Sequence, residues 1–239
     1  MKILIIPDVH GRKFWREHIN DEFDHIIFLG DYLDPYPGEA TAEEALQEFK
    51  DIVNFKNSNL EKVTLLIGNH DCPYMFEYYR KALRYWCRHD NERHDEIAKI
   101  FEDNLDKFQI AWECDNEKYG KVLFTHAGVS SKFKRICGLD AEQINTFFLK
   151  EDTNNIPNIV GLAAVSFYRG GASDTGSPVW ADVREHLKNP VTEIFQIFGH
   201  TYLKDSIIEE HFAMLDRGDS CYLLDKNGIT NLSIKKDDN

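Results

Sequence analysis

The chain has 239 residues with a hydrophobic fraction of 42%, which is the composition of a globular protein and excludes a disordered chain. Its formal net charge of −13 makes nucleic acid and anionic membranes unsuitable partners, because an acidic surface repels polyanions. The five cysteines form no C-x-x-C pair, so we expect reduced thiols and a cytoplasmic protein rather than a zinc ribbon or a disulfide framework. The apolar run at the N-terminus is too short for a signal peptide, and we expect no membrane span.

Three strand–loop–helix units are predicted in the first third of the chain. The strands are short apolar runs at residues 3–6, 26–29 and 63–67. A helix is expected over 13–20, and a longer one begins with the capping-box pattern of Thr41 and Glu44. This alternation of strands and helices predicts a mostly parallel sheet with right-handed crossovers.

Residues 74–108 are predicted to be helical and are rich in aromatic side chains, with a charged block at 88–95. One interpretation of this block is a solvated turn between two helices. The other is that the segment is a cap over the site and contributes to the choice of substrate. We expect a mixture of the two, and we treat the segment as a cap-like insertion in a single domain that covers residues 1–239.

A second series of strands follows, separated by helices and loops. Apolar runs predict strands at residues 110–113, 121–124, 192–198, 213–215 and 221–224. A helix is expected over about 141–150 and ends at the Asn- and Pro-containing segment 154–158. Residues 226–228 form a turn by composition, and the tail at 235–239 is expected to fray.

Side chains that commonly bind metal ions follow five of the predicted strands. They are Asp8 and His10, Asp31 and Asp34, Asn69 and His70, then His126, and finally His200. A single histidine in such a place is more often a structural residue, but five such loops in one chain are hard to obtain by chance. Because ligands bind at the carboxyl ends of strands in open α/β sheets, these side chains are candidates for one site.

The sequence G-D-Y-L-D at residues 30–34 places two carboxylates three residues apart at the end of a buried strand. Carboxylates held close together repel each other and favour a bound cation. The whole set combines carboxylate, amide and imidazole groups without cysteine, which suits Mn²⁺, Fe or Zn²⁺. The ligands are sufficient for two divalent ions, which a carboxylate can bridge at a separation of about 3.5–4 Å. We expect manganese as the first choice of metal, with iron or zinc as alternatives.

The motifs D-x-H, G-D-x-x-D, G-N-H-D, H-A-G and G-H-T, in this order between residues 8 and 201, resemble those of the calcineurin-like metallophosphoesterase superfamily. The pattern is most similar to the phosphoprotein (Ser/Thr) phosphatase branch and its bacterial and phage relatives, because His126 lies in T-H-A-G and His200 in G-H-T. Nuclease and phosphodiesterase branches usually have G-H-x-H, and here Tyr202 replaces the second histidine. The resemblance implies an α/β fold of two packed mixed β-sheets flanked by helices.

The resemblance also implies two ion sites at the strand ends. Their ligands would be Asp8, His10 and Asp31 for the first ion, and the bridging Asp31 with Asn69, His126 and His200 for the second. His70 would be the general acid that protonates the leaving oxygen, and Asp34 would orient it. A hydroxide shared by the two ions would attack phosphorus in line.

One departure concerns the phosphate-binding arginine of the family, which follows G-D-x-x-D and is replaced here by Pro35. The phosphate-binding candidates are Arg169, in an Arg-Gly-Gly loop, and Arg184, with Arg12 as a third choice. A guanidinium group can bind phosphate through two hydrogen bonds at once. A second departure is Asp71, which replaces the glutamate of G-N-H-E and which we interpret as a mild change.

The expected function is that of a dinuclear metal-dependent phosphatase that hydrolyses phosphomonoesters, either on Ser or Thr of a protein or on a small metabolite. One alternative is a nucleotide hydrolase or phosphodiesterase that acts on dinucleoside polyphosphates or cyclic nucleotides. Another is a catalytically silent scaffold of the same fold. Such scaffolds usually lack metal ligands or the acid histidine, which this sequence retains. The sequence does not indicate an oligomeric state.

Overall fold

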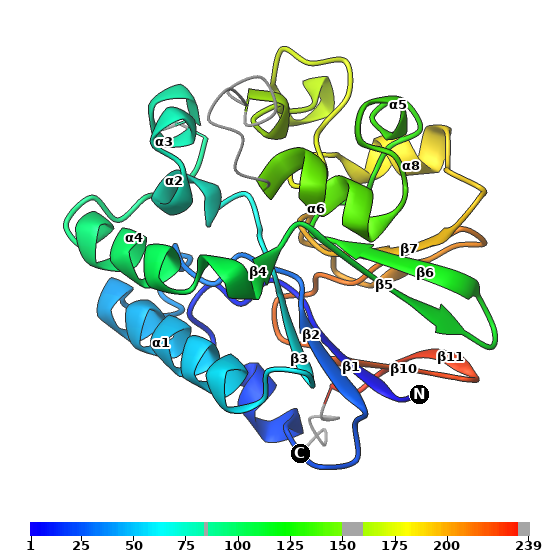
Figure 1. The fold of residues 1–239 in the computed structure, drawn as a ribbon, viewed down its shortest axis with the longest axis horizontal. Coiled ribbons are helices and arrows are strands. Elements are labelled where there is room, and N and C mark those ends of the chain that lie inside the picture. The colour runs from blue at the N-terminus through cyan, green and yellow to red at the C-terminus, as the bar shows by residue number, and fades with distance from the viewer. Residues whose placement is uncertain (84–85, 150–159, 234–239) are drawn as a thin grey trace.

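Two mixed β-sheets packed face to face form the centre of the computed structural model, which describes residues 1–83, 86–149 and 160–233 (Figure 1). The first sheet contains, in spatial order, β11 (Gly228–Asn231), β10 (Tyr222–Asp225), β1 (Ile3–Ile6), β2 (His25–Phe28), β3 (Val63–Leu66) and β4 (Phe108–Gln109). The second contains β5 (Ala111–Asn116), β6 (Gly120–Thr125), β7 (Phe195–Phe198), β9 (Phe212–Met214) and β8 (Ile207–Ile208). Helices cover the outer faces, so the predicted α/β architecture of two sheets flanked by helices is confirmed.

The strands that matter for the site run in the same direction within each sheet. In the first sheet β1, β2, β3 and β4 pair in parallel, while β10 and β11 are antiparallel additions at one edge. In the second sheet β6, β7 and β9 are parallel, and β5 and β8 pair antiparallel at the edges. The carboxyl ends of parallel neighbours lie at the same edge of a sheet, and this places the loops after β1, β2 and β3 beside one another.

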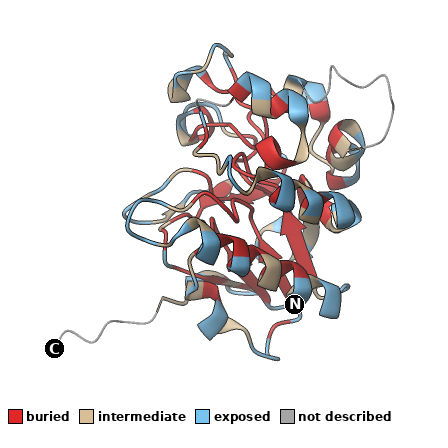
Figure 2. Cartoon of the chain, turned by 90° about the vertical axis from the view of Figure 1, so that its left-hand side faces the viewer, coloured by how far each residue is buried: buried red, intermediate tan, exposed pale blue. Residues whose placement is uncertain are grey.

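The alternation of side chains along β1 explains how one strand serves two hydrophobic layers. Ile3 and Ile5 belong to the core between the two sheets, whereas Leu4 and Ile6 belong to the larger core beneath the helices. Figure 2 shows the result as buried strands between helices whose outer faces are exposed. The site loops therefore extend from strands that are packed on both faces.

Helices cover the two sheets separately. α1 (Ala42–Ser58) and α4 (His94–Asp103) lie against the first sheet, with the rings of Phe49 and Phe101 4.7 Å apart. The described residues also contain α2 (Cys72–Met75), α3 (Glu77–Leu83), α5 (Lys134–Cys137), α6 (Ala141–Leu149), α8 (Val183–Lys188), and the 3-10 helices η1 (Phe14–His18), η2 (Leu105–Lys107) and η3 (Phe167–Arg169). The capping box predicted from Thr41 and Glu44 is present at the start of α1. Within the described residues, no helix has the length and apolar character that a membrane crossing requires.

Several predicted elements differ from the structure. The helix predicted over 13–20 is only the 3-10 helix η1, because Lys13 provides no side-chain cap and Ile19 returns to extended backbone. Residues 86–93, predicted to be helical, form an irregular connection between α3 and α4 that contains most of the charged block. The strand predicted from residue 192 begins only at Phe195. The predictions for residues 154–158, the tail at 235–239 and the aromatic residue at position 85 lie outside the described residues.

Candidate active site

The loops after β1, β2 and β3 meet the loops after β6 and β7 at one edge of the paired sheets. The amide of His10 donates to the carbonyl oxygen of Asp31 at 2.7 Å, and the amide of Gly199 donates to the carbonyl oxygen of His126 at 2.8 Å. The amide of His200 donates to both carboxylate oxygens of Asp8, at 3.0 and 3.1 Å, which joins loops of the two sheets. The structure thereby brings together the buried side chains of Asp8, His10, Asp31, Asp34, Asn69, His70, His126 and His200.

Two groups of side chains in this cluster have ligand atoms within 4.8 Å of one another. One consists of His10, Asp31 and His70, and the other of Asp31, His126 and His200. The Oδ2 atom of Asp31 lies 3.5 Å from Nε2 of His10 and 3.5 Å from Nε2 of His126. A single carboxylate oxygen is therefore close to a histidine nitrogen of each group.

Hydrogen-bond acceptors of Asn69 and Asp31 surround the Nε2 atom of His126. Its Nδ1 atom lies 2.9 Å from the carbonyl oxygen of Leu29, which can only accept, so this nitrogen carries the proton of the neutral ring. Its Nε2 atom then presents a lone pair to Oδ1 of Asn69 at 3.0 Å and to the Asp31 carboxylate. Hydrogen-bond acceptors this close to one another are satisfied by a shared cation. The residues present therefore fit a divalent metal ion.

The same arrangement recurs at His10. Its Nδ1 atom lies 2.8 Å from the carbonyl oxygen of Leu33, so Nε2 is again the nitrogen that faces Asp31. Burial lowers the pKa of His10 to about 3, although the Asp31 carboxylate opposes this shift. The ring is therefore neutral at physiological pH, which is the form that binds metal.

Four of the candidate residues have left-handed backbone conformations. The φ angles are 46°, 53°, 59° and 73° for His10, Asp31, Asp34 and His200 respectively. This conformation costs a side-chain-bearing residue roughly 1–2 kcal/mol. Strain of this kind is maintained where the surrounding structure fixes it, and it concentrates at functional sites.

Two glycines allow the carboxylates to approach the neighbouring loops. A Cβ atom at Gly68 would lie 2.2 Å from Oδ1 of Asp31, and one at Gly199 would lie 2.2 Å from Oδ1 of Asp8. Both distances are far below van der Waals contact, so no larger residue fits without displacing the carboxylate. The glycines of G-N-H-D and G-H-T are therefore explained by close packing against the acidic side chains.

His70, a member of the first group, forms a hydrogen-bonded pair with Asp34. Nδ1 of His70 lies 2.8 Å from Oδ2 of Asp34, and the hydroxyl of Tyr74 donates to Oδ1 of Asp34 at 2.5 Å. Burial opposes protonation of His70, but the carboxylates of Asp31 and Asp34 outweigh burial and raise its pKa above the ordinary value. The pair can therefore hold a proton beside the Asp31 carboxylate.

Asp71 joins two of the site loops. Its carboxylate accepts hydrogen bonds from the amides of Asp31 at 2.8 Å, Tyr32 at 3.1 Å and Gly68 at 2.8 Å. Burial and the nearby Asp31 carboxylate raise the pKa of Asp71 to about 8. The short side chain at this position thus fixes the backbone that carries the shared carboxylate.

The three predicted arginines make different contacts near the site. Arg169 donates to the hydroxyl of Thr201, the residue after His200, at 2.9 Å, and its Nη1 atom lies 3.6 Å from Asp182. Arg184 is half exposed and pairs with the same Asp182 at 2.6 Å. Arg12 donates to the carbonyl oxygen of Asp8 at 2.8 Å.

Three residues beside the site were not predicted from the sequence. They are Tyr74, Cys87 and Arg88, which contact Asp34 and Asn69. All three come from the segment that carries the charged block and its helices. Their only signal in the sequence was the interpretation of residues 74–108 as a cap that contributes to the site.

Residues 1–204 match the family described as calcineurin-like phosphoesterase. The chain belongs to this family. Membership confirms the resemblance seen in the five motifs and makes the chain an enzyme that hydrolyses phosphoesters. In this phosphoesterase, the two groups of His and Asp side chains described above could bind metal ions. Comparison with curated protein sequences finds no match.

Two solved structures have a similar fold to this phosphoesterase. A cold-active protein tyrosine phosphatase is 18% identical with a TM-score of 0.57, and the alignment covers 96% of this chain and 75% of the other. A protein serine/threonine phosphatase from Saccharomyces cerevisiae is 14% identical with a TM-score of 0.51, with 97% and 79% covered. At these identities the likeness concerns the fold alone.

Proposed function

We propose that this phosphoesterase is a dinuclear metal-dependent phosphatase that hydrolyses phosphomonoesters. The observation that carries the proposal is the Asp31 carboxylate, which is common to both donor groups and lies next to the His70–Asp34 pair. In the proposed site the ligands are Asp8, His10 and Asp31 for one ion, and Asp31, Asn69, His126 and His200 for the other. Mn²⁺ is the first ion to test, with Fe and Zn²⁺ as alternatives, because the donor set contains no thiolate.

The chain's own residues would position the substrate and the proton. Two divalent ions, when bound, supply a water of lowered pKa and neutralise charge on the phosphoryl oxygens. Asp34 faces Nδ1 of His70, which leaves Nε2 as the nitrogen that can give a proton to the leaving oxygen. Arg169 is a proposed phosphate contact because it lies beside the His200 loop. Arg184 is a poorer candidate, because its half-exposed side chain pairs closely with Asp182, at 2.6 Å.

The proposed substrate is a phosphoserine or phosphothreonine in a protein, or a small phosphorylated metabolite. The motif G-H-T, in which Tyr202 takes the place of a second histidine, favours a monoester over a diester. Hydrolysis of dinucleoside polyphosphates or cyclic nucleotides is the alternative. The retained His70–Asp34 pair argues against a silent scaffold. The cytoplasm is the proposed compartment, in keeping with five cysteines that are all free.

The test compares hydrolysis of p-nitrophenyl phosphate with that of bis-p-nitrophenyl phosphate after chelation, with and without added Mn²⁺. We expect Mn²⁺-dependent hydrolysis with preference for the monoester. The variant Asp31→Ala should lose bound metal and activity together. His70→Ala should keep its metal and lose most turnover of monoesters with poor leaving groups.

Two results would contradict the proposal in different ways. Preference for the diester would favour the nucleotide hydrolase. Retention of both ions by Asp31→Ala in metal analysis would show that its carboxylate is not the bridge.

A further inference from the structure

Within the part of the chain that the structure describes, one arginine beside the donor groups has no carboxylate partner. Among the described residues, Arg88 forms no ion pair within 4.0 Å, although the protein has a net charge of −13. Two other arginines near the site are paired, Arg12 with Glu39 at 3.5 Å and Arg169 with Asp182 at 3.6 Å. Among the described residues, the positive charge of Arg88 thus has no direct carboxylate contact at a partly buried position, where electrostatic attraction is stronger than in water.

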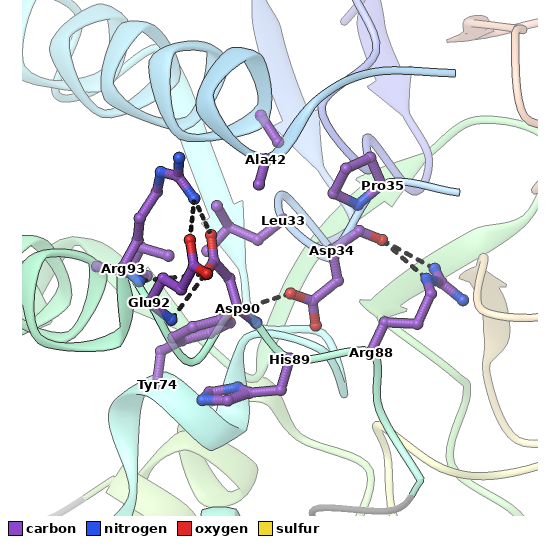
Figure 3. Close-up of a pocket in the computed structure, with 12 residues that line it drawn as sticks. Leu33, Asp34, Pro35, Ala42, Tyr74, Arg88, His89, Asp90, Glu92 and Arg93 are labelled. Carbon is purple, nitrogen blue, oxygen red and sulfur yellow. Dashed lines mark hydrogen bonds and ion pairs between the residues drawn. The ribbon is translucent and has the colours of Figure 1, made fainter. Parts of the chain in front are cut away.

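Neutral groups hold the guanidinium in a fixed orientation. Its Nε and one Nη atom donate to the carbonyl oxygen of Asp34 at 3.1 and 2.9 Å, as Figure 3 shows. The guanidinium carbon lies 3.8 Å from the centroid of the Tyr36 ring. These contacts involve residues on either side of Pro35. No carboxylate of the described residues bonds to the other Nη atom.

Arg88 contacts two residues, Tyr36 and Asp34, that in turn contact side chains of the proposed active site. The Tyr36 ring beneath it lies 5.1 Å from the ring of His10, and the Asp34 carboxylate is bonded to His70. Arg88 is therefore one side chain away from a metal-donor histidine and from the proposed acid.

The neighbouring residue anchors the same segment to a second site loop. The side-chain amide of Asn69 donates to the sulfur of Cys87 at 3.8 Å, and that sulfur donates to the Asn69 carbonyl oxygen at 3.5 Å. Cys87 and Arg88 thus hold the connection between α3 and α4 against the loops after β3 and β2. The position of the guanidinium group is therefore fixed, because Cys87 and Arg88 are both held by contacts of their side chains.

A pocket of about 330 Å³ adjoins Arg88, Asp34 and Tyr74. The second arginine of its lining, Arg93, is bonded to Asp90 at 3.1 Å, and Figure 3 shows these two side chains at the opposite side of the pocket from the Arg88 guanidinium. The lining also contains the acidic residues Asp34, Asp90 and Glu92, and among its described residues Arg88 is the arginine without an ion-pair partner.

We propose that Arg88 binds the phosphoryl oxygens of the substrate, so that the connection between α3 and α4 supplies the cation that is absent at Pro35. The ligand class is a phosphate monoester dianion, or inorganic phosphate as the product. The substrate identity rests on the proposed function, but binding of phosphate can be measured without turnover.

The test is isothermal titration of inorganic phosphate into the Mn²⁺-loaded protein. The variants are Arg88→Met, which keeps the length of the side chain without its charge, and Arg88→Lys, which keeps the charge without the planar fork. Arg80→Met is the matched control, because Arg80 lies in α3 and pairs with Glu77 at 2.9 Å. We expect Arg88→Met to weaken phosphate binding by roughly 10- to 100-fold, the effect of losing charge-assisted hydrogen bonds. Arg88→Lys should lie in between, Arg80→Met should stay within about twofold of the wild type, and metal content should not change.

Several outcomes would overturn the proposal. Wild-type affinity in Arg88→Met, equal losses in Arg88→Met and Arg80→Met, or no phosphate binding by the wild type would each do so. If Arg88→Met does not fold, Arg88→Lys decides, since wild-type affinity there would exclude recognition by the guanidinium. A wild type that binds phosphate through Arg88 but hydrolyses no monoester would support this assignment and contradict only the proposed function.

Discussion

The hydroxyl of Tyr74 occupies a central place in a chain of hydrogen bonds that ends at the proposed acid. It accepts from the amide of Asp90 at 2.8 Å and donates to Asp34 at 2.5 Å, while the other oxygen of Asp34 faces His70. A carboxylate fixed at both oxygens holds one orientation of the imidazole. Tyr74 is thus a positioning residue that acts through Asp34.

We expect Tyr74→Phe to lower kcat by about 10-fold on alkyl phosphates, whose leaving group needs a proton. The effect on p-nitrophenyl phosphate should be smaller, because p-nitrophenolate leaves without one, and KM should change little for either substrate. Steady-state kinetics on both substrates checks this. An equal loss of kcat on the two would mean that Tyr74 serves the packing rather than the acid.

At the scale of single residues, the proposed metal donors could be predicted and their supporting partners could not. Each donor follows an apolar strand in the sequence, so local pattern and motif order are enough to find it. Arg88 is 54 residues from Asp34 and depends on the path of an irregular segment. Its charged neighbours look like any solvated turn, and no local rule distinguishes the arginine that turns inward.

At the scale of strands and loops, the end of β7 must pass close to Asp8. We expect Gly199→Ala to weaken Mn²⁺ binding by about 10-fold or more, because the new methyl group would displace the carboxylate. Isothermal titration of Mn²⁺ provides the measurement. Gly161→Ala is the control, since a Cβ atom there meets nothing within 4 Å. Unchanged affinity in Gly199→Ala would mean that Asp8 is not a ligand.

Among the elements, those with strong local signals were predicted well. α1 has its capping box and a repeated apolar face, and the first three strands lie within a residue of their predicted bounds. The helix expected over 13–20 contracted to η1, since its one buried side chain, Trp15, gives too little amphipathic character for a longer helix. Where the local sequence signal is weak, as in this segment, tertiary packing determines the secondary structure.

At the scale of the whole molecule, His25 joins the two sheets. Its ring, on β2, stacks on that of Trp112, on β5, with 4.4 Å between the ring centroids and 2° between the planes. Nε2 of His25 also lies 2.9 Å from the hydroxyl oxygen of Thr64. Burial lowers its pKa from 6.5 to about 4.

This pKa predicts a pH dependence of folding. Because the folded state binds the proton less readily than the unfolded chain, the contribution of neutral His25 is complete above about pH 6.5 and is lost as the pH falls toward 4. We expect the stability difference between wild type and His25→Gln to shrink over this range. Urea unfolding of the chelated proteins at pH 7, 5.5 and 4.5 measures it. A difference that stays constant with pH would assign the acid sensitivity to other groups.

The packing of the two sheets was predicted from the family resemblance rather than from the strand patterns. Apolar runs indicate buried strands but do not say which sheet each one joins, and β10 returns from the far end of the chain to pair with β1. We propose that residues 1–239 form one phosphoesterase domain with residues 74–108 as a helical insertion. The contacts of Cys87 and Arg88 with the site loops support this interpretation.

The hydrogen bond from the His200 amide to the Asp8 carboxylate spans 192 positions of the chain. Translation delivers Asp8 first and His200 last, so a nascent chain on the ribosome carries clustered carboxylates long before the histidines that complete the donor groups. Until β7 has been synthesised and has docked beside β6, the early loops hold only part of the proposed ligand set, and we expect them to bind a metal ion weakly. For the proposed metal site we therefore expect loading to occur late, after nearly all of the polypeptide has been made.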